Sequence, residues 1–118
     1  MKVIDAVKAI NGKEINLPDP EREVTCGYAG DFLSHVMGSA PSDSAWFTIM
    51  NNVNVCAVAT LADIALIVLC ESVMPDDNLL TRVKSQGFNI VSSSVIPFSS
   101  CPQSLPASES FPMSQLCA

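Results

Sequence analysis

Three asparagines, Asn51, Asn52 and Asn54, follow the largely apolar segment 45–50, and their type and spacing indicate a candidate binding site. Each side-chain amide donates and accepts hydrogen bonds, so a group of three can hold a neutral polar ligand. Asparagine is equally a common capping and turn residue, and a purely structural role for this group stays open.

A second candidate is the segment 27–31, Gly-Tyr-Ala-Gly-Asp, which we predict to be a turn between a strand and a helix. Two glycines permit a tight turn, and the N–H groups at the start of the helix then face the edge of the sheet. Tyr28 and Asp31 are therefore candidate ligand contacts. A half-buried tyrosine and a simple helix cap explain them as well. Cys26, in the same turn, is a weaker candidate for a redox thiol, because a helix N-terminus lowers a thiol pKa.

Glu71 and Ser72 follow the seven-residue apolar run from Ile64 to Cys70. In a parallel sheet, the residues that follow each strand gather at one edge, where ligands bind. We therefore expect a single ligand site at that edge. Its candidate residues are Tyr28, Asp31, Asn51, Asn52, Asn54, Glu71 and Ser72.

The sequence contains no motif typical of an enzyme or a metal site. The phosphate-loop, dinucleotide, zinc-protease and nucleophile-elbow patterns are all absent from the 118 residues. The one histidine, His35, lies at the margin of the apolar face of a predicted helix, where a structural or surface role is the usual one. The five cysteines include no C-x-x-C pair. We predict no catalytic activity, no cofactor and no metal.

Composition and charge narrow the class of protein. Hydrophobic residues make up 48% of the chain and charged residues 15%, which is typical of a folded domain. The formal net charge is −6, and the few basic residues are scattered singly, so binding to nucleic acid or to an anionic membrane is not expected. The basic residues are Lys2, Lys8, Lys13, Arg22, Arg82 and Lys84.

Two features predict a cytoplasmic protein. Asp5 stands where a secretory signal needs its apolar stretch, and the longest apolar run, seven residues, is far shorter than the roughly twenty that a membrane span needs. An odd number of cysteines without a close pair is typical of reduced thiols in the cytoplasm.

The pattern of apolar residues predicts strands that alternate with helices of about ten residues, which implies parallel crossover connections. We therefore predict an α/β fold, a three-layer α/β/α sandwich with a mostly parallel sheet of about five strands. The predicted helices cover 3–10, 31–38, 53–62 and 76–86, and the predicted strands cover 14–17, 23–26, 46–49, 65–69 and 88–91.

The predicted domain covers residues 1–92, and residues 93–118 form an atypical tail. Serines and four prolines dominate the chain from Ser92 onward, without the apolar period of a helix. A poorly ordered tail and a covering helix lost through a reading-frame change both explain this composition. We expect Val95, Ile96 and Phe98 to pack against the sheet.

Three segments of the body, 22–34, 45–49 and 54–59, resemble the short, stand-alone members of the DRTGG domain family in sequence, order and spacing. The resemblance covers about residues 1–92. It implies a fold akin to the N-terminal domain of HPr kinase/phosphorylase and a regulatory module, since related domains accompany CBS domains and phosphate acetyltransferases. It implies no particular reaction.

The chain departs from the two motifs that name this family. Asn51-Asn52 stands where longer members have an Asp-Arg pair, and Cys70-Glu71-Ser72 stands where they have Thr-Gly-Gly. Loss of the arginine removes a bidentate anion clamp, and the glutamate adds repulsion. These departures argue against a phosphate-bearing ligand at this place.

Two functions remain open. The first is a non-catalytic regulatory module that senses a small polar metabolite and acts through a protein partner. The second is a protein–protein adaptor that binds no ligand. In either case we expect a homodimer, because an apolar crossover helix such as 53–62 is suited to a twofold contact.

Overall fold

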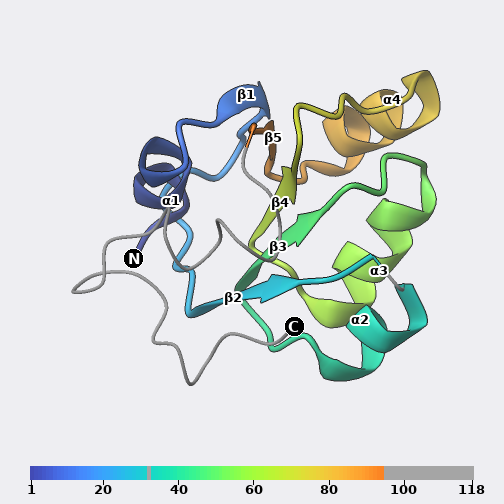
Figure 1. Ribbon diagram of the computed structural model, residues 1–118, viewed down its shortest axis with the longest axis horizontal. Helices are drawn as coiled ribbons and strands as arrows, with labels where there is room; N and C mark the ends of the chain where they lie inside the picture. The colour runs from blue at the N-terminus through green and yellow to red at the C-terminus, as the bar shows by residue number, and fades with distance from the viewer. Residues whose placement is uncertain (32, 95–118) are drawn as a thin grey trace.

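The computed structural model describes residues 1–31 and 33–94 (Figure 1). It contains four helices and five strands in this part of the chain. The order is α1 (Val3–Ala9), β1 (Lys13–Asn16), β2 (Cys26–Ala29), α2 (Leu33–Ser39), β3 (Ser44–Thr48), α3 (Asn54–Ala62), β4 (Leu66–Leu69), α4 (Asp77–Gln86) and β5 (Ile90–Ser92). The predictions for the tail beyond Ser94 lie outside the described residues.

The five strands form one sheet in the order β1-β5-β4-β3-β2. The pairs β2–β3, β3–β4 and β4–β5 are parallel, and β1 lies antiparallel to β5 at one side. The predicted α/β fold with a mostly parallel sheet of about five strands is confirmed. Because four strands run the same way, their carboxyl ends share one edge of the sheet, called here the carboxyl edge, and their amino ends share the opposite amino edge.

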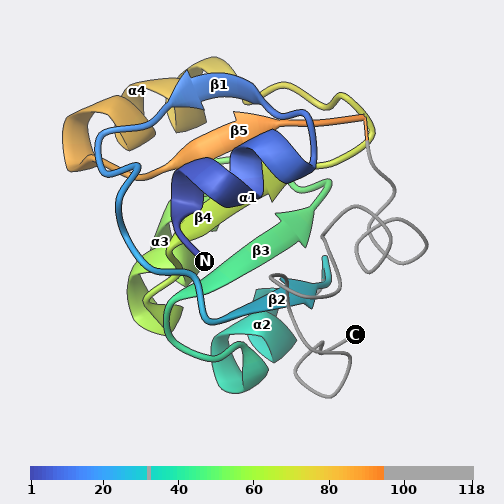
Figure 2. The same cartoon turned by 90° about the vertical axis from the view of Figure 1, so that its left-hand side faces the viewer.

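Helices lie on both faces of the sheet. Figure 2 shows α1 in front of one face and α2, α3 and α4 behind the other. Two apolar clusters match this division: one joins α1 to residues such as Phe47 and Val68, and the other joins the three helices to residues such as Trp46 and Ile67. The side chains of successive residues in β3 and β4 therefore pack on opposite faces of the sheet, as expected for strands that are covered on both sides.

Helix ends follow the signals in the sequence. The Asp76 side chain accepts a 2.8 Å hydrogen bond from the Leu79 N–H at the start of α4, and Gly87 ends that helix with a φ of 73°. Asn11 follows α1 with a φ of 54°, and the Gly12 N–H donates to the Val7 carbonyl. Capping and left-handed residues therefore end α1 and α4 where the sequence predicts, whereas α2 runs through Gly38, its predicted end, to Ser39.

Strand β2 corrects the prediction. The expected strand over 23–26 is observed three residues later, at Cys26–Ala29. Residues 23 and 24 contact the start of the chain instead: Glu23 forms an isolated bridge with Lys2, and the Val24 N–H donates to the Met1 carbonyl. Strands β3 and β5 also differ from their predicted bounds, because Ile49 lies beyond β3 and β5 begins at Ile90.

Candidate functional site

The loops that follow the parallel strands meet at the carboxyl edge. The loop after β2 contacts the end of β3, the loop after β3 contacts the loop after β4, and that loop contacts the end of β5. All predicted site residues except Tyr28 lie in these loops or at the start of α3. The expectation that the crossover loops converge at one edge is therefore confirmed for the backbone. The side chains of the predicted site residues do not all converge there.

Tyr28 does not lie in a turn. It is a residue of β2, fully buried, and it packs in the apolar cluster of Val36 and Trp46. Its ring centroid lies 6.3 Å from that of His35. The prediction of an accessible Tyr28 is wrong, because β2 begins later than the sequence pattern indicates and takes this residue into the sheet.

Cys26 lies at the other end of the same strand. It is the first residue of β2, buried, and opposite Ser44 of β3. This position is at the amino edge, whereas α2 follows the carboxyl end of β2. The predicted placement of Cys26 in a turn beside a helix N-terminus is therefore wrong.

Asp31 joins two strand ends. Its Oδ1 accepts hydrogen bonds from the Thr48 hydroxyl at 2.7 Å and from the Ile49 N–H at 2.9 Å. We predicted a helix cap or a ligand contact, whereas this oxygen holds the end of β3. Helix α2 then begins at Leu33. The carboxylate thus fixes the spacing of two neighbouring loops at the carboxyl edge.

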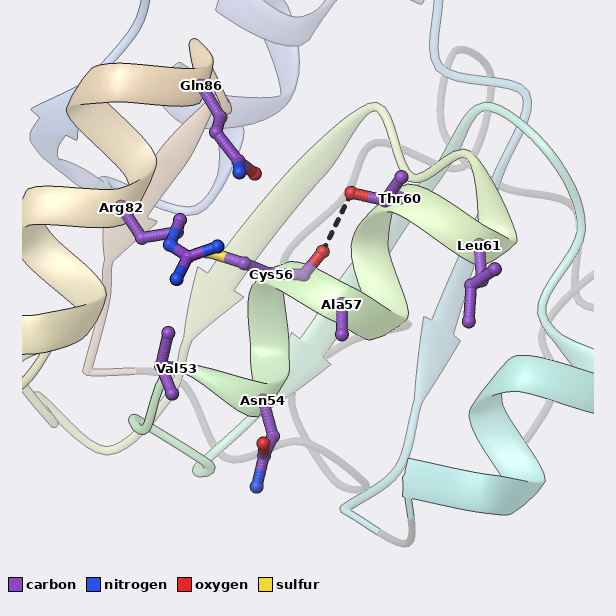
Figure 3. Close-up of a pocket in the computed structure, with 8 residues that line it drawn as sticks. All are labelled: Val53, Asn54, Cys56, Ala57, Thr60, Leu61, Arg82 and Gln86. Atoms are coloured by element: carbon purple, nitrogen blue, oxygen red, sulfur yellow. Dashed lines mark hydrogen bonds between the residues drawn. The ribbon is translucent and has the colours of Figure 1, made fainter.

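The three asparagines do not converge. The Asn51 amide donates to the Met74 carbonyl at 2.9 Å, and the Asn52 Oδ1 accepts from the Asn54 N–H at 3.0 Å. The Asn54 side chain is exposed on α3, and Figure 3 shows it pointing away from the other labelled residues. Asn51 connects two loops and Asn52 caps the start of a helix, which is the structural role that the sequence left open.

Glu71 and Ser72 are exposed and share an unusual backbone conformation. Their φ angles are 55° and 59°, in the left-handed region that residues other than glycine rarely occupy. The Ser72 N–H donates to the Ser93 carbonyl at 2.8 Å, which ties this turn to the end of β5. Ser72 is thereby held beside residues that the sequence did not single out.

A hollow of about 450 Å³ lies beside Ser72 at the carboxyl edge. It opens between the turn after α1, the turn after β4 and the end of β5. The Ser93 hydroxyl donates to the Ile10 carbonyl at 2.8 Å and the Ser92 hydroxyl donates to the Val73 carbonyl at 3.0 Å, so both turns are fixed to β5. The described residues that line it are Asn11, Lys13, Ser72, Met74, Ser92, Ser93 and Ser94.

Sequence reasoning missed all of these residues except Ser72. Lys13 reaches the hollow because it pairs with Ser92 in the antiparallel contact between β1 and β5. That contact joins distant parts of the chain, and no local pattern predicts it. The cluster Ser92-Ser93-Ser94 directly after an apolar strand was the available signal, and we had assigned it to the domain boundary.

A second hollow, of about 410 Å³, lies between α3 and α4 on the helical side of the sheet (Figure 3). Cys56 and Arg82 face each other there. Burial raises the pKa of the Cys56 thiol, and the Arg82 charge opposes this only in part. The thiol therefore stays protonated at neutral pH, which makes it a poor nucleophile. Val53, Ala57 and Leu61 also line this groove.

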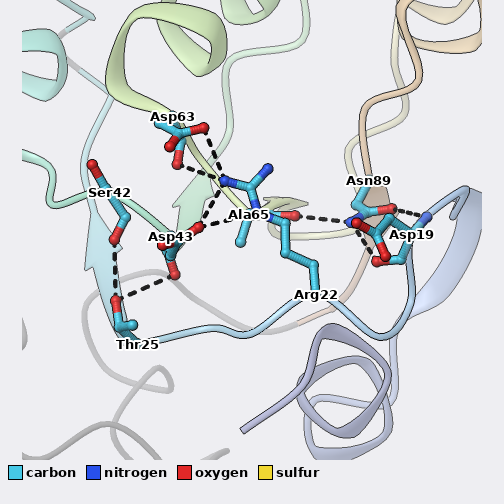
Figure 4. Close-up of polar contacts among 8 residues, drawn as sticks. All are labelled: Asp19, Arg22, Thr25, Ser42, Asp43, Asp63, Ala65 and Asn89. Atoms are coloured by element: carbon cyan, nitrogen blue, oxygen red, sulfur yellow. Dashed lines mark hydrogen bonds and ion pairs between the residues drawn. The ribbon is translucent and has the colours of Figure 1, made fainter.

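The amino edge carries a network around Arg22 (Figure 4). The Arg22 guanidinium donates to the Asp43 carboxylate at 2.8 Å and to the Asp63 carboxylate at 2.9 Å. Burial lowers the pKa of Arg22, and the hydrogen bonds to the two aspartates together with their negative charges raise it by more. Both aspartates have a φ above 50° and stand in the turns before β3 and β4. Arg22 therefore ties three connections together.

Asn89 completes the amino edge. Its amide donates to the carbonyls of Ala65 at 3.0 Å and Asp19 at 2.9 Å, and its Oδ1 accepts from the Asp19 N–H at 3.0 Å. The side chain is 6% exposed. These bonds use both N–H groups and the oxygen of the amide, so Asn89 links the loop at Asp19 to the residue before β4.

Comparison with known proteins adds no identification. The chain matches no protein-family model, and it matches no curated protein. Within residues 1–31 and 33–94, no helix is long and apolar enough to cross a membrane, and no three histidine, cysteine, aspartate or glutamate side chains form a group that would hold a metal ion.

Proposed function

We propose that this chain is a DRTGG-like, non-catalytic regulatory module that binds a small polar ligand at the carboxyl edge and acts through a protein partner. The observation that carries the proposal is the hollow of about 450 Å³ beside Ser72. Its position is where open parallel sheets bind ligands, outside the carboxyl ends of the strands. The cytoplasm is the compartment that we assign to it.

The chemistry of the hollow favours a polar ligand with a small apolar part. Lys13 supplies an ammonium group, and Ser72 and Ser94 supply exposed hydroxyls that donate and accept. Met74, which is 47% exposed, adds an apolar wall. A convergent set of donors and acceptors beside one apolar side chain is typical of a specific small-molecule site.

Binding without catalysis is the role these residues support. The single histidine is on α2, and the lining of the hollow in the described residues includes no cysteine and no carboxylate. Group transfer needs a nucleophile paired with a base. Among the residues that line the hollow, only the serines and Lys13 resemble such a pair. The resemblance of 22–34, 45–49 and 54–59 to the DRTGG family supports the regulatory role.

A protein–protein adaptor is the second candidate function. Ile49 and Met74 are large apolar residues at the same edge, and each is at least 40% exposed. Exposed apolar side chains beside polar groups also suit a protein partner. The two functions differ in what stabilises the protein, and this difference is the basis of the test.

The test is thermal denaturation with a panel of small polar metabolites, both neutral and anionic. A ligand at a hundred times its dissociation constant stabilises the folded state by about 2.7 kcal/mol, which gives a clear shift in the unfolding midpoint. We expect at least one metabolite to raise the unfolding midpoint of the wild type, and we expect a smaller rise in the Lys13→Gln variant. Lys84→Gln, an exposed lysine of α4, is the matched control and should respond like the wild type.

A shift of equal size in Lys13→Gln and the wild type would contradict the assigned site. If no small molecule stabilises the protein and a partner protein does, the adaptor function replaces the proposed one.

A further inference from the structure

Strand β2 is buried although it is the outermost strand on its side of the sheet. The strand order β1-β5-β4-β3-β2 gives it only β3 as a neighbour. All four of its residues are nevertheless buried. An edge strand stays buried only where another segment of chain covers it. The burial of β2 therefore requires a covering segment.

The described helices cover β2 and β3 on one face only. Figure 2 shows α1 in front of β4 and β5, with α2, α3 and α4 behind the sheet, and no described helix in front of β2 or β3. A helix is about 10 Å wide and strands are about 4.8 Å apart, so α1 covers about two strands. We call the face on which α1 packs the α1 face.

Small residues form the α1 face of β2 and β3. Gly27 lies beside Ala45 in the register of these strands, and Ala29 lies beside Phe47. Ala29 is 6% exposed, and Ala45 and Phe47 are 0% exposed.

The opposite face of the same strands carries Tyr28 beside Trp46, packed against the helices. Protein interiors are close-packed, so small side chains on the α1 face must meet large ones from the segment that covers them. Leu17 and Val24 join the cluster of α1, but they precede β2 and lie toward the amino edge. The carboxyl halves of β2 and β3 need a different cover.

The chain that follows β5 starts on the correct side of the sheet. The Ser93 hydroxyl donates to the Ile10 carbonyl at 2.8 Å, which fixes the end of β5 beside the end of α1. Strand β3 is two strands from β5, a distance of about 10 Å. An extended chain advances about 3.3 Å per residue, so the four residues after Ser94 span about 13 Å. They can therefore reach β3 and the margin of β2.

The composition of these four residues suits a shallow apolar surface. Val95, Ile96 and Phe98 are large and apolar. Pro97 disfavours a helical conformation at Ile96 and favours an extended one. The sequence predicts that these residues pack against the sheet, without indicating the face or the strands.

We infer that residues 95–98 cross the α1 face from β5 toward β2 and that Phe98 packs over Ala29 and Ala45. A covalently attached segment has a high effective concentration at its site. A second copy has no such advantage and is repelled by the formal charge of −6 on each chain. The contact uses none of the side chains assigned to the ligand, so either proposal can fail while the other stands.

Nuclear Overhauser contacts in the full chain, labelled at alanine and isoleucine methyl groups and at phenylalanine rings, test this placement. We expect contacts from the Phe98 ring to the methyl groups of Ala29 and Ala45. A mixture of labelled and unlabelled chain separates contacts within one chain from contacts between copies. Contacts only between copies, or no contact from Ile96 or Phe98 to either alanine, would overturn the inference.

Thermal unfolding of full-length variants is the second test. Phe98→Asp should lower the unfolding midpoint by roughly 10 °C, because a buried aromatic ring is lost and a carboxylate takes its place. Phe98→Leu keeps an apolar side chain and should lower it by less than half as much. Phe111→Asp is the matched control, the same substitution farther along the chain, and should melt like the wild type. Equal midpoints for Phe98→Asp and Phe111→Asp would refute the assigned contact.

Discussion

The two edges of the sheet use polar side chains for different purposes. At the amino edge, the side chains of Arg22 and Asn89 make hydrogen bonds to several backbone and carboxylate groups of distant loops. At the carboxyl edge, Asp31 and Asn51 hold the loops in a similar way, but a hollow remains beside Ser72. The difference separates the part of the fold that closes the sheet from the part that is open to a ligand.

The comparison teaches that a polar residue near a strand end is not by itself a site residue. Asp31 and Asn51 were predicted as ligand contacts, and their hydrogen bonds place them in the same class as Arg22. Lys13 was not predicted, and it lies in the hollow. Substitutions at the amino edge should therefore change stability, whereas those in the hollow should change binding.

Asn89→Ala should give the largest loss of stability. It removes three hydrogen bonds and leaves the buried carbonyl of Ala65 and the partly buried N–H and carbonyl of Asp19 without this partner, at a cost of about 3 kcal/mol. Urea denaturation measures the change in the free energy of unfolding. Asn78→Ala, at an exposed position of α4, is the control. Equal effects in the two variants would remove the structural role of Asn89.

Arg22→Gln should destabilise by about 1 kcal/mol, because the ion pairs that it breaks are partly exposed to solvent. Arg22→Lys keeps the charge and loses the fork that reaches both aspartates, so its effect should be intermediate. The measurement is urea denaturation at low and high salt, and the difference from wild type should shrink with salt. An effect of Arg22→Lys as large as that of Arg22→Gln would show that charge matters less than geometry.

The pH dependence of the Arg22 contribution follows from the direction of its pKa shift. The pKa is raised in the folded state, so the contribution is complete below the ordinary guanidinium pKa and is lost only as the pH rises through the raised value. The difference between wild type and Arg22→Gln should therefore be constant from neutral to moderately alkaline pH. A decline across that range in a denaturation series would contradict the assignment.

Glycine substitutions should change the free energy of unfolding in opposite directions at the two edges. These changes should be the smallest of those predicted here. Glu71→Gly should stabilise by about 0.5 kcal/mol, because glycine accepts a φ of 55° without strain. Asp43→Gly relieves a similar angle but removes a partner of Arg22, so it should destabilise by about as much. Thermal unfolding measures both. Glu71→Ala keeps the strain and should not stabilise; if it does, the carboxylate and not the backbone is responsible.

The helices were predictable from the sequence because their signals are local. The spacing of apolar residues and the pair Asp76 and Gly87 define α4, and the continuous apolar run defines β4. The start of β2 was not predictable, because residues 23 and 24 have a strand-like pattern that they use against the start of the chain. Local pattern cannot distinguish the sheet from another extended contact.

The candidate site was predictable only in position. Parallel strands dictate that crossover loops share an edge, and the structure agrees. Lys13 lies in the hollow because it pairs with Ser92, and Tyr28 is buried because β2 pairs with β3 in the observed register. Both are long-range contacts, which residue spacing along the chain does not encode.

Chemical-shift mapping tests the central claim, that the carboxyl edge is the open edge of the sheet, most directly. The measurement is a titration of the ¹⁵N-labelled full chain with a stabilising metabolite from the thermal panel. We predict saturable shifts at the amides of Lys13, Ser72 and Ser93, with those of Arg22 and Asp43 unchanged. Shifts centred on Arg22, Asp43 and Asp63, with Ser72 and Ser93 unchanged, would contradict the account.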